Sequence, residues 1–407
     1  MKNNRIKRSF FIPLLLISFW LLLFEYSSYL ILKRWGDPLD KAYEVIEAHS
    51  QLGWKQKSSL NTLFYDEKLT TNADGFRHTS PSTLKDHHYN IMTLGPSSAF
   101  GWGVSDNDTY SHLFSELIAN FSHKKTLSLN LSQIGHSSFQ GYKLYEEQRI
   151  QNLKPQLLLI SYGVNDIDKF RFFFSSPQDD INELSTPKPK QTIRLLNTIH
   201  SSYFLRLVTR TVAQVSTKFS CKPLTSPPVE RLSLQNSFKY LSKIIEKAQS
   251  KDVSVILVNT PFKLPTPSEN LDKKWLNLNS MGLEAKKSGD LDSAIKYFKD
   301  SLDSNQNQTV AHYQLMTLYA LQQECFSASK HLALARENEP SRIHGDLLAF
   351  NKELSYLSNK YKIKLLDAHT LLAQNEQNFV DPIHPSKRGH NLIAKELFKL
   401  WVNNINE

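Results

Sequence analysis

Two stretches far apart in the chain contain residue types that could together carry out nucleophilic chemistry. In LGPSSAFGWGV (94–104), Ser97 follows an apolar run and precedes small and aromatic turn residues. In FVDPIHPSKRGH, Asp381 and His384 lie three residues apart. A serine hydroxyl is a poor nucleophile until a base takes its proton, and histidine can do this near neutral pH. The pattern predicts Ser97 as nucleophile, His384 as base and Asp381 as the carboxylate that orients the imidazole.

Two more positions could donate hydrogen bonds to the negative oxygen of a tetrahedral intermediate. Gly135 lies on a turn in NLSQIGHSS, and Asn165 lies in SYGVNDID. Together with the backbone N–H of Ser97, the N–H of Gly135 and the amide of Asn165 would form an oxyanion hole. The alternative for Asn165 and Asp166 is that they cap the helix that follows.

The elements that must position these residues are five short apolar runs rich in β-forming residues. Amphipathic, helix-like segments separate them, and this alternation predicts an α/β fold with a parallel sheet covered on both faces. The carboxyl ends of parallel strands meet at one edge, where Ser97, Gly135 and Asn165 would gather. The runs lie at 89–95, 126–132, 155–163, 253–260 and 363–368.

In chain order, GPSSAFGWGV, SQIGHSS, GVND and DPIHP resemble the sequence blocks of the SGNH, or GDSL-like, hydrolases, which are named for Ser, Gly, Asn and His. The resemblance covers 89–168, 253–264 and 355–402. It implies a flavodoxin-like three-layer α/β/α fold. It also implies esterase or acyl-transfer chemistry without a metal or an organic cofactor.

The first block departs from the family, which normally has Asp before the serine where this chain has Pro96. Proline fixes φ and removes a backbone N–H, so another group must organise the turn if activity is retained. Ser98 is an adjacent alternative nucleophile. Asp367 and His369 form a rival Asp/His pair, but they directly follow a predicted strand in mid-sheet, where the family has no catalytic pair.

The N-terminus resembles an uncleaved membrane anchor. The basic stretch MKNNRIKR precedes an apolar segment from Phe10 to Leu32, which is long enough to cross a bilayer and has no convincing signal-peptide cleavage site after it. More basic residues precede the segment than the pair Lys33 and Arg34 that follows it. The positive-inside rule therefore predicts a cytoplasmic N-terminus and an extracytoplasmic main domain. The alternative is a buried helix of a soluble domain.

A helical insertion interrupts the α/β pattern at 265–345. Two segments align with a period of 34 residues, which resembles a pair of tetratricopeptide repeats that could bind a protein partner. The alternative is ordinary amphipathic helices with a chance period. The aligned pairs are Gly282 with Met316, Ala294 with Ala328, and Phe298 with Leu332.

The sequence thus predicts five regions. A short helix followed by a polar, turn-rich stretch is expected within the second region, and an insertion at 166–230 within the third. The regions are a tip and anchor (1–34), a juxtamembrane lead-in (35–88), the first part of the hydrolase domain (89–264), the helical insertion (265–345) and the C-terminal part of the hydrolase domain (346–407).

Composition excludes several other classes of protein. The 407 residues carry a formal charge of +10, but apart from the N-terminal cluster the basic residues are scattered, so a nucleic-acid-binding surface is not predicted. The two cysteines, Cys221 and Cys325, lack the neighbours that a zinc site needs, and the sequence leaves open whether they pair.

These patterns together predict a membrane-anchored, extracytoplasmic serine hydrolase that cleaves or transfers an ester-linked acyl group. The substrate would be an acylated small molecule, glycan or lipid. The alternative is a scaffold or binding protein that acts through its repeat-like insertion and has lost catalysis at the Pro96 site.

Overall fold

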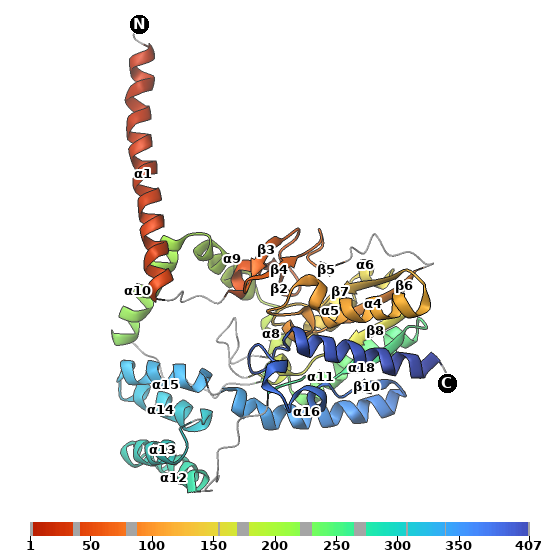
Figure 1. Ribbon diagram of the computed structural model, residues 1–407. Coiled ribbons are helices and arrows are strands. Elements are labelled where there is room, and N and C mark those ends of the chain that lie inside the picture. The colour runs from red at the N-terminus through yellow and green to blue at the C-terminus, as the bar shows by residue number, and fades with distance from the viewer. Residues whose placement is uncertain are drawn as a thin grey trace.

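The computed structural model describes residues 3–35, 41–78, 88–153, 155–168, 179–219, 230–263, 274–306, 308–337 and 339–405. The main part of the protein is an α/β domain built around a six-stranded sheet. Helix α1 (Asn3–Trp35) extends away from this domain (Figure 1). Within α1, Leu15–Arg34 is long and apolar enough to cross a membrane.

All five predicted strands are present and mutually parallel, which confirms the predicted α/β fold. A two-residue strand, β5 (Arg77–His78), pairs antiparallel with β7 at the edge of the sheet and was not predicted. The spatial order is β10-β9-β8-β6-β7-β5. The parallel strands are β6 (Tyr89–Leu94), β7 (Thr126–Asn130), β8 (Leu157–Ile160), β9 (Ser254–Val258) and β10 (Lys364–Leu366).

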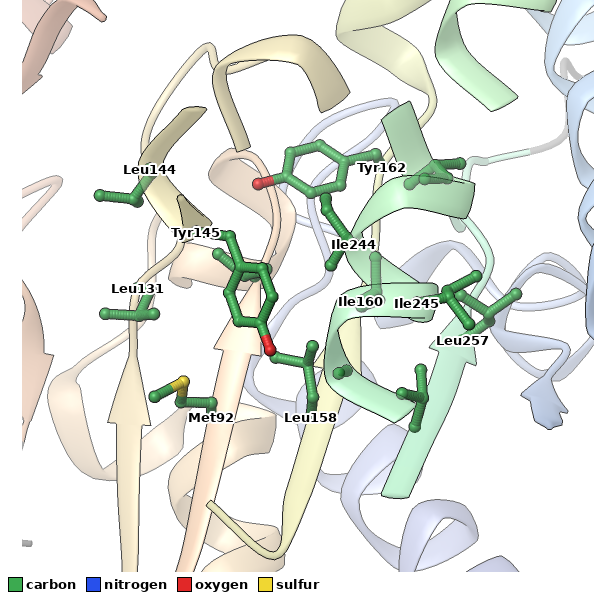
Figure 2. Close-up of a cluster of buried hydrophobic side chains, with 14 of the residues drawn as sticks. Met92, Leu131, Leu144, Tyr145, Leu158, Ile160, Tyr162, Ile244, Ile245 and Leu257 are labelled. Atoms are coloured by element: carbon green, nitrogen blue, oxygen red, sulfur yellow. The ribbon is translucent and has the colours of Figure 1, made fainter. Parts of the chain in front are cut away.

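Side chains alternate along the strands and bury a core on each face of the sheet. Met92, Leu158 and Ile160 pack in one core, whereas Ile91 and Leu159 pack in the other. Figure 2 shows the first core, where Leu144, Tyr145, Ile244 and Ile245 from the covering helices meet the strand residues. That face is covered by α5 (Ser138–Tyr145), α11 (Leu234–Gln249) and α16 (Glu339–Tyr361), and the other by α4 (Tyr110–Ser122) and α18 (Lys387–Ile405).

Numbered by their place in the chain, the parallel strands cross the sheet in the order 2-1-3-4-5, the flavodoxin-like arrangement. After β6 the chain passes to α4 on one face, and after β8 it passes to α11 on the other. A crevice is expected at such a switch point, outside the carboxyl ends of the strands. The loops that contain Ser97 and Asn165 leave from these two strands.

The segment before β6 is more structured than predicted. The helix expected from DPLDKAYEVIEAHSQLGW is only the four-residue α2 (Ala42–Val45), after which the chain forms β-hairpins. Their side chains, including Trp54 and Phe64, pack with Phe100 and Trp102 beside the Ser97 turn. The hairpin strands are β1 (Ile46–His49), β2 (Gly53–Gln56), β3 (Asn61–Phe64) and β4 (Glu67–Thr70).

Between β8 and α11 the chain forms α8 (Asp180–Glu183), α9 (Lys188–His200) and α10 (Tyr203–Phe219). Helix α9 packs against β1 and β2, and α10 packs against α1 (Figure 1). Residues 169–178 and 220–229, which belong to the predicted insertion at 166–230, lie outside the described residues.

The second insertion forms two helical hairpins. Helices α13 and α15 begin at Leu291 and Cys325, which reproduces the 34-residue period, but assignment of these helices to the tetratricopeptide family stays a prediction. A Cβ at Gly282 would come within 2.8 Å of the Phe298 ring, so a small residue is needed there. The helices are α12 (Lys274–Ser288), α13 (Leu291–Ser304), α14 (Thr309–Leu321) and α15 (Cys325–Glu337).

Cys325, at the start of α15, is disulfide-bonded. The other cysteine of the chain, Cys221, lies outside the described residues.

Candidate active site

The structure brings the predicted nucleophile, base and carboxylate into one hydrogen-bonded chain. His384 Nε2 lies 2.7 Å from Ser97 Oγ, and His384 Nδ1 lies 2.6 Å from Asp381 Oδ2. Ser97 and His384 keep 7% and 8% of their surface exposed, so the pair is nearly covered but retains contact with solvent. This is the arrangement that activates a serine hydroxyl.

The carboxylate fixes which imidazole nitrogen carries the proton. Burial alone would raise the pKa of Asp381, but His384 beside it and three hydrogen bonds lower the pKa below its usual 3.8. An ionised carboxylate can only accept hydrogen bonds, so His384 Nδ1 donates to it and Nε2 is left to accept from the Ser97 hydroxyl. Asp381 Oδ1 also accepts hydrogen bonds from the backbone N–H groups of Ile383 and His384, at 3.0 and 2.9 Å. These bonds fix the position of the Asp381 carboxylate relative to His384.

Ser97 is the first residue of the four-residue helix α3 (Ser97–Phe100), directly after β6 and Pro96. The first N–H groups of a helix have no partner within it, so the Ser97 N–H is not used by α3 itself. Gly101 ends α3 at φ +94, where a Cβ would lie 2.5 Å from Thr109 and 2.6 Å from Arg77. The turn therefore requires glycine at this position.

A buried arginine organises the turn that contains Pro96 and Ser97. Arg77, from the edge strand β5, donates to the carbonyls of Phe100, Gly101 and Val104 at 2.9, 2.7 and 2.6 Å. Its Nε donates to Asp106 at 2.7 Å. A guanidinium can reach all these acceptors at once because its five N–H groups form a rigid fork.

The loop that contains Gly135 is held by a second buried arginine. Gly135 adopts φ +73 and its carbonyl accepts from Arg231 Nη1 at 2.6 Å. Arg231 in turn pairs with Asp180 at 2.8 Å, and both side chains are almost fully buried. The adjacent Ile134 carbonyl accepts from Trp54 Nε1 at 2.8 Å. Strand β2, helix α8 and the segment before α11 thus fix this loop.

Asn165 lies beside the same loop. It belongs to the short helix α7 (Val164–Ile167) after β8, and its Nδ2 donates to the His136 carbonyl at 3.0 Å. An amide nitrogen carries two hydrogens, so one remains for another acceptor. The loops after β7 and β8 are also tied to the end of β6, because Gln133 N donates to Gly95 O at 2.9 Å and Ser161 N to Leu94 O at 2.8 Å.

Aromatic rings form one wall of the site. The Trp102 ring stacks on the His384 imidazole, with 5.0 Å between centroids and 15° between planes. Tyr65, at the tip of the β3–β4 hairpin, lies 5.2 Å from the Trp102 ring and is 41% exposed. The lead-in segment therefore contacts the ring that stacks on the proposed base.

The rival residues Asp367 and His369 follow β10, which is an edge strand and not a strand in mid-sheet as predicted, and they have other contacts. Asp367 caps helix α17 (Ala368–Leu372) by accepting from Thr370 N, and His369 stacks on Phe262 with 3.9 Å between centroids. Ser98 is buried in α3, and its Oγ has no hydrogen-bond partner among the described residues. Among the candidates weighed from the sequence, Ser97 and His384 are the pair joined by a hydrogen bond.

Sequence analysis missed Arg77, Arg231 and Trp54. Isolated arginines carry no motif, and their partners lie as much as 96 residues away in the chain. Trp102 lay within the motif around Ser97, but nothing in the sequence indicated that it would stack on His384.

No protein-family model matches this chain, and no curated protein matches it. Its fold and site define a doubly wound α/β protein with a Ser–His–Asp chain at the switch point. Solved structures that it resembles include one named as a GDSL-like lipase and two named as esterases.

Three of these structures cover most of both chains at low identity. A GDSL-like lipase from Bacteroides thetaiotaomicron is 11% identical and covers 80% of this chain and 94% of its own, with a TM-score of 0.35. An esterase from Pseudoalteromonas sp. is 10% identical and covers 78% of this chain and 100% of its own, with a TM-score of 0.35. An acetylxylan esterase from Geobacillus stearothermophilus is 10% identical and covers 78% of this chain and 95% of its own, with a TM-score of 0.36.

Proposed function

We propose that the chain is a serine hydrolase of the SGNH type that cleaves or transfers an ester-linked acyl group. The observation that carries this proposal is the chain of hydrogen bonds from Asp381 through His384 to Ser97 at the switch point of the sheet. Ser97 Oγ attacks the acyl carbonyl while His384 Nε2 takes its proton. The negative oxygen that forms is bound by the N–H groups of Ser97 and Gly135 and the amide of Asn165.

Collapse of this intermediate breaks the ester C–O bond, and His384 returns the proton to the leaving alcohol. The acyl group is now attached to Ser97 Oγ. A water or an acceptor hydroxyl then attacks the acyl carbon, again with His384 as base, which releases the acid or a new ester and restores Ser97. Hydrolysis and transfer differ only in which hydroxyl enters this second step.

Turnover of p-nitrophenyl acetate and longer acyl esters tests the reaction class. Wild type should release nitrophenol, and Ser97→Ala and His384→Ala should lose about 10³-fold or more in kcat. Ser98→Ala is the matched control, because this neighbouring hydroxyl has no place in the hydrogen-bonded chain, and it should keep wild-type turnover. Equal release by wild type and Ser97→Ala contradicts the proposal. A glycan or alcohol acceptor added to the assay distinguishes transfer from hydrolysis by the product formed.

We also propose that α1 anchors the protein and that the hydrolase domain lies outside the cytoplasm. The excess of basic residues before the apolar segment supports this orientation. The disulfide at Cys325 supports it independently, because disulfides persist mainly in oxidising compartments. A reporter that is active only outside the cytoplasm, fused after Glu407, should be active. An inactive reporter on an expressed, membrane-bound protein contradicts the orientation.

A further inference from the structure

The corner between α9 and α10 is bound to the side of α1. Glu25 of α1 accepts hydrogen bonds from Ser202 Oγ at 2.8 Å and from the backbone N–H groups of Tyr203 and Phe204 at 2.5 and 3.1 Å. Ring contacts add to these, because Phe24 lies 6.0 Å from Phe204. Figure 1 shows α10 crossing the lower part of α1. The start of α10 is therefore fixed at the level of Glu25.

Glu25 lies inside the apolar part of α1. A membrane-spanning helix needs about 20 apolar residues, and the candidate span Leu15–Arg34 has 20. At 1.5 Å per residue, Glu25 lies roughly 13 Å along α1 from Arg34. Beyond Glu25 the helix still exposes apolar side chains, since Tyr26 and Leu30 are 61% and 47% exposed. If Leu15–Arg34 spans a bilayer, Glu25 and the first turn of α10 lie just on the outer side of its middle, since Glu25 is roughly 15 Å along the helix from Leu15 and roughly 13 Å from Arg34.

The contact between α1 and α10 satisfies polar groups that would be costly in that position. A carboxylate within hydrocarbon is expensive unless it is paired. The first N–H groups of a helix lack partners and carry partial positive charge. Glu25 and the first turn of α10 therefore satisfy each other, which allows both to lie below the headgroups.

The surface of the corner matches a lipid environment. Tyr203, Phe204 and Leu205 are 37–44% exposed, and Val208 and Val212 farther along α10 are 40% and 60% exposed. Helices α9 and α10 contain no Asp or Glu. Lys188 and Arg194 on α9 are exposed, whereas Arg206 and Arg210 on α10 are half-buried, and Arg206 Nε donates to the His200 carbonyl at 3.0 Å. An exposed apolar face beside basic residues is typical of helices that lie in a membrane interface that contains anionic lipids.

We propose that residues 202–212 insert into the outer leaflet of the membrane that α1 spans, with Lys188 and Arg194 facing anionic phospholipid headgroups. This inference depends on the anchoring proposed above but not on the catalytic chemistry. Helix α9 packs on β1 and β2, and Asn197 Nδ2 donates to Ile46 O at 3.1 Å. The insertion would therefore hold the hairpins of the lead-in segment, which pack beside the Ser97 turn, against the membrane.

Photo-crosslinking in the full-length protein tests the contact directly. The photo-crosslinking residue benzoylphenylalanine would replace one residue at a time. Phe204 is the test position and Trp20 of α1 is the positive control. Tyr356, which lies on α16 and is 70% exposed, is the negative control. The proteins would be placed in nanodiscs of phosphatidylcholine with a minority of phosphatidylglycerol, and lipid adducts would be measured by mass spectrometry. We expect adducts at 204 and 20 and none above background at 356.

Lipid adducts at position 20 without lipid adducts at position 204 would overturn the proposed insertion and leave the anchor intact. Adducts at neither position would overturn both the inference and the anchor, while ester turnover by the same preparations reports the catalytic proposal separately. In a second variant, Glu25→Leu, adducts at 204 should be lost and those at 20 retained, and unchanged adducts at 204 would contradict the role of Glu25. Unchanged adducts at 204 after Lys188→Gln and Arg194→Gln would contradict the contact with anionic headgroups.

Discussion

The indole of Trp102 lies flat against the imidazole of His384, with 5.0 Å between ring centroids and 15° between the planes. Both residues belong to loops at the carboxyl edge of the sheet. Phe64 packs edge-on against Trp102, and the Tyr65 ring packs against it at a tilt. A ring in this position limits rotation of the imidazole about its side-chain bonds. The stack therefore keeps Nε2 directed at Ser97 while Asp381 holds Nδ1.

Loss of this ring should lower the catalytic rate more than substrate binding. An aromatic pair contributes about 0.5–1.5 kcal/mol beyond its buried area, so Trp102→Ala should reduce kcat about 2- to 13-fold. Trp102→Phe keeps an aromatic face against His384 and should retain most of the rate. Steady-state kinetics that separate kcat from KM would check this. Wild-type kcat in Trp102→Ala would show that the stack does not position the base.

Asn165 should contribute to the rate through its side-chain amide. Removal of one oxyanion-hole donor typically costs about 10²–10³ in kcat, and Asn165→Ala is expected to fall in this range with little change in KM. The Ser98→Ala variant, measured under the same conditions, controls for the effect of truncating a side chain near the site. An Asn165→Ala enzyme with undiminished kcat would exclude the amide from the oxyanion hole.

Arg77 should matter for stability because its guanidinium satisfies three backbone carbonyls and a carboxylate in the interior. A lysine keeps the charge but cannot reach these acceptors together, so Arg77→Lys should lower the free energy of unfolding by about 3–5 kcal/mol. Lys399→Ala, which removes an exposed pair with Glu396 at 2.7 Å, should cost less than about 1 kcal/mol. Urea unfolding of both variants provides the comparison, and similar losses in the two would contradict the role assigned to Arg77.

The buried carboxyl of Asp166 should produce a pH-dependent difference in stability. Burial raises its pKa from 3.8 to about 6, although hydrogen bonds from Ser138 oppose this. The folded state then binds this proton more tightly than the unfolded state, so its contribution to stability falls as pH rises from about 4 to 6. The penalty at neutral pH is on the order of 2–3 kcal/mol.

Asp166→Asn removes this titration and leaves an oxygen that can still accept from Ser138. The difference in unfolding free energy between the variant and wild type should therefore shift in favour of the variant between pH 4 and 7. Comparing the two proteins at each pH cancels the contribution of buried histidines such as His136 and His390. A difference that stays constant with pH would show that Asp166 titrates normally.

The parts of the fold that could be predicted from sequence are those with strong local signals. The runs that form β6, β8 and β9 consist mostly of buried apolar residues, because both faces of the sheet are covered. Asp381 and His384 could be predicted as a pair because their spacing allows a local turn, in which Asp381 Oδ1 accepts from the His384 backbone. The positions of Ser97 and Asn165 followed from their place directly after strands.

The lead-in segment could not be predicted in the same way. Its strands are four residues or shorter. β3 exposes three of its four residues and β4 buries only Leu69, so no alternation of apolar and polar residues marks them. The contribution of Arg77 depends on contacts 23 to 29 residues away, and that of Arg231 on contacts 51 to 96 residues away. Such partners are fixed by tertiary packing and leave no local pattern in the sequence.

The central claim is that Ser97 is a nucleophile activated by His384, and covalent labelling tests it most directly. Wild type, Ser97→Ala, Ser98→Ala and His384→Ala would be treated with a serine-directed phosphonate, and the adduct would be measured by intact mass and located by peptide mapping. We expect one adduct on Ser97 in wild type and in Ser98→Ala, none in Ser97→Ala and much slower labelling in His384→Ala. Absence of labelling in folded wild type, or equal labelling in Ser97→Ala, would contradict the claim.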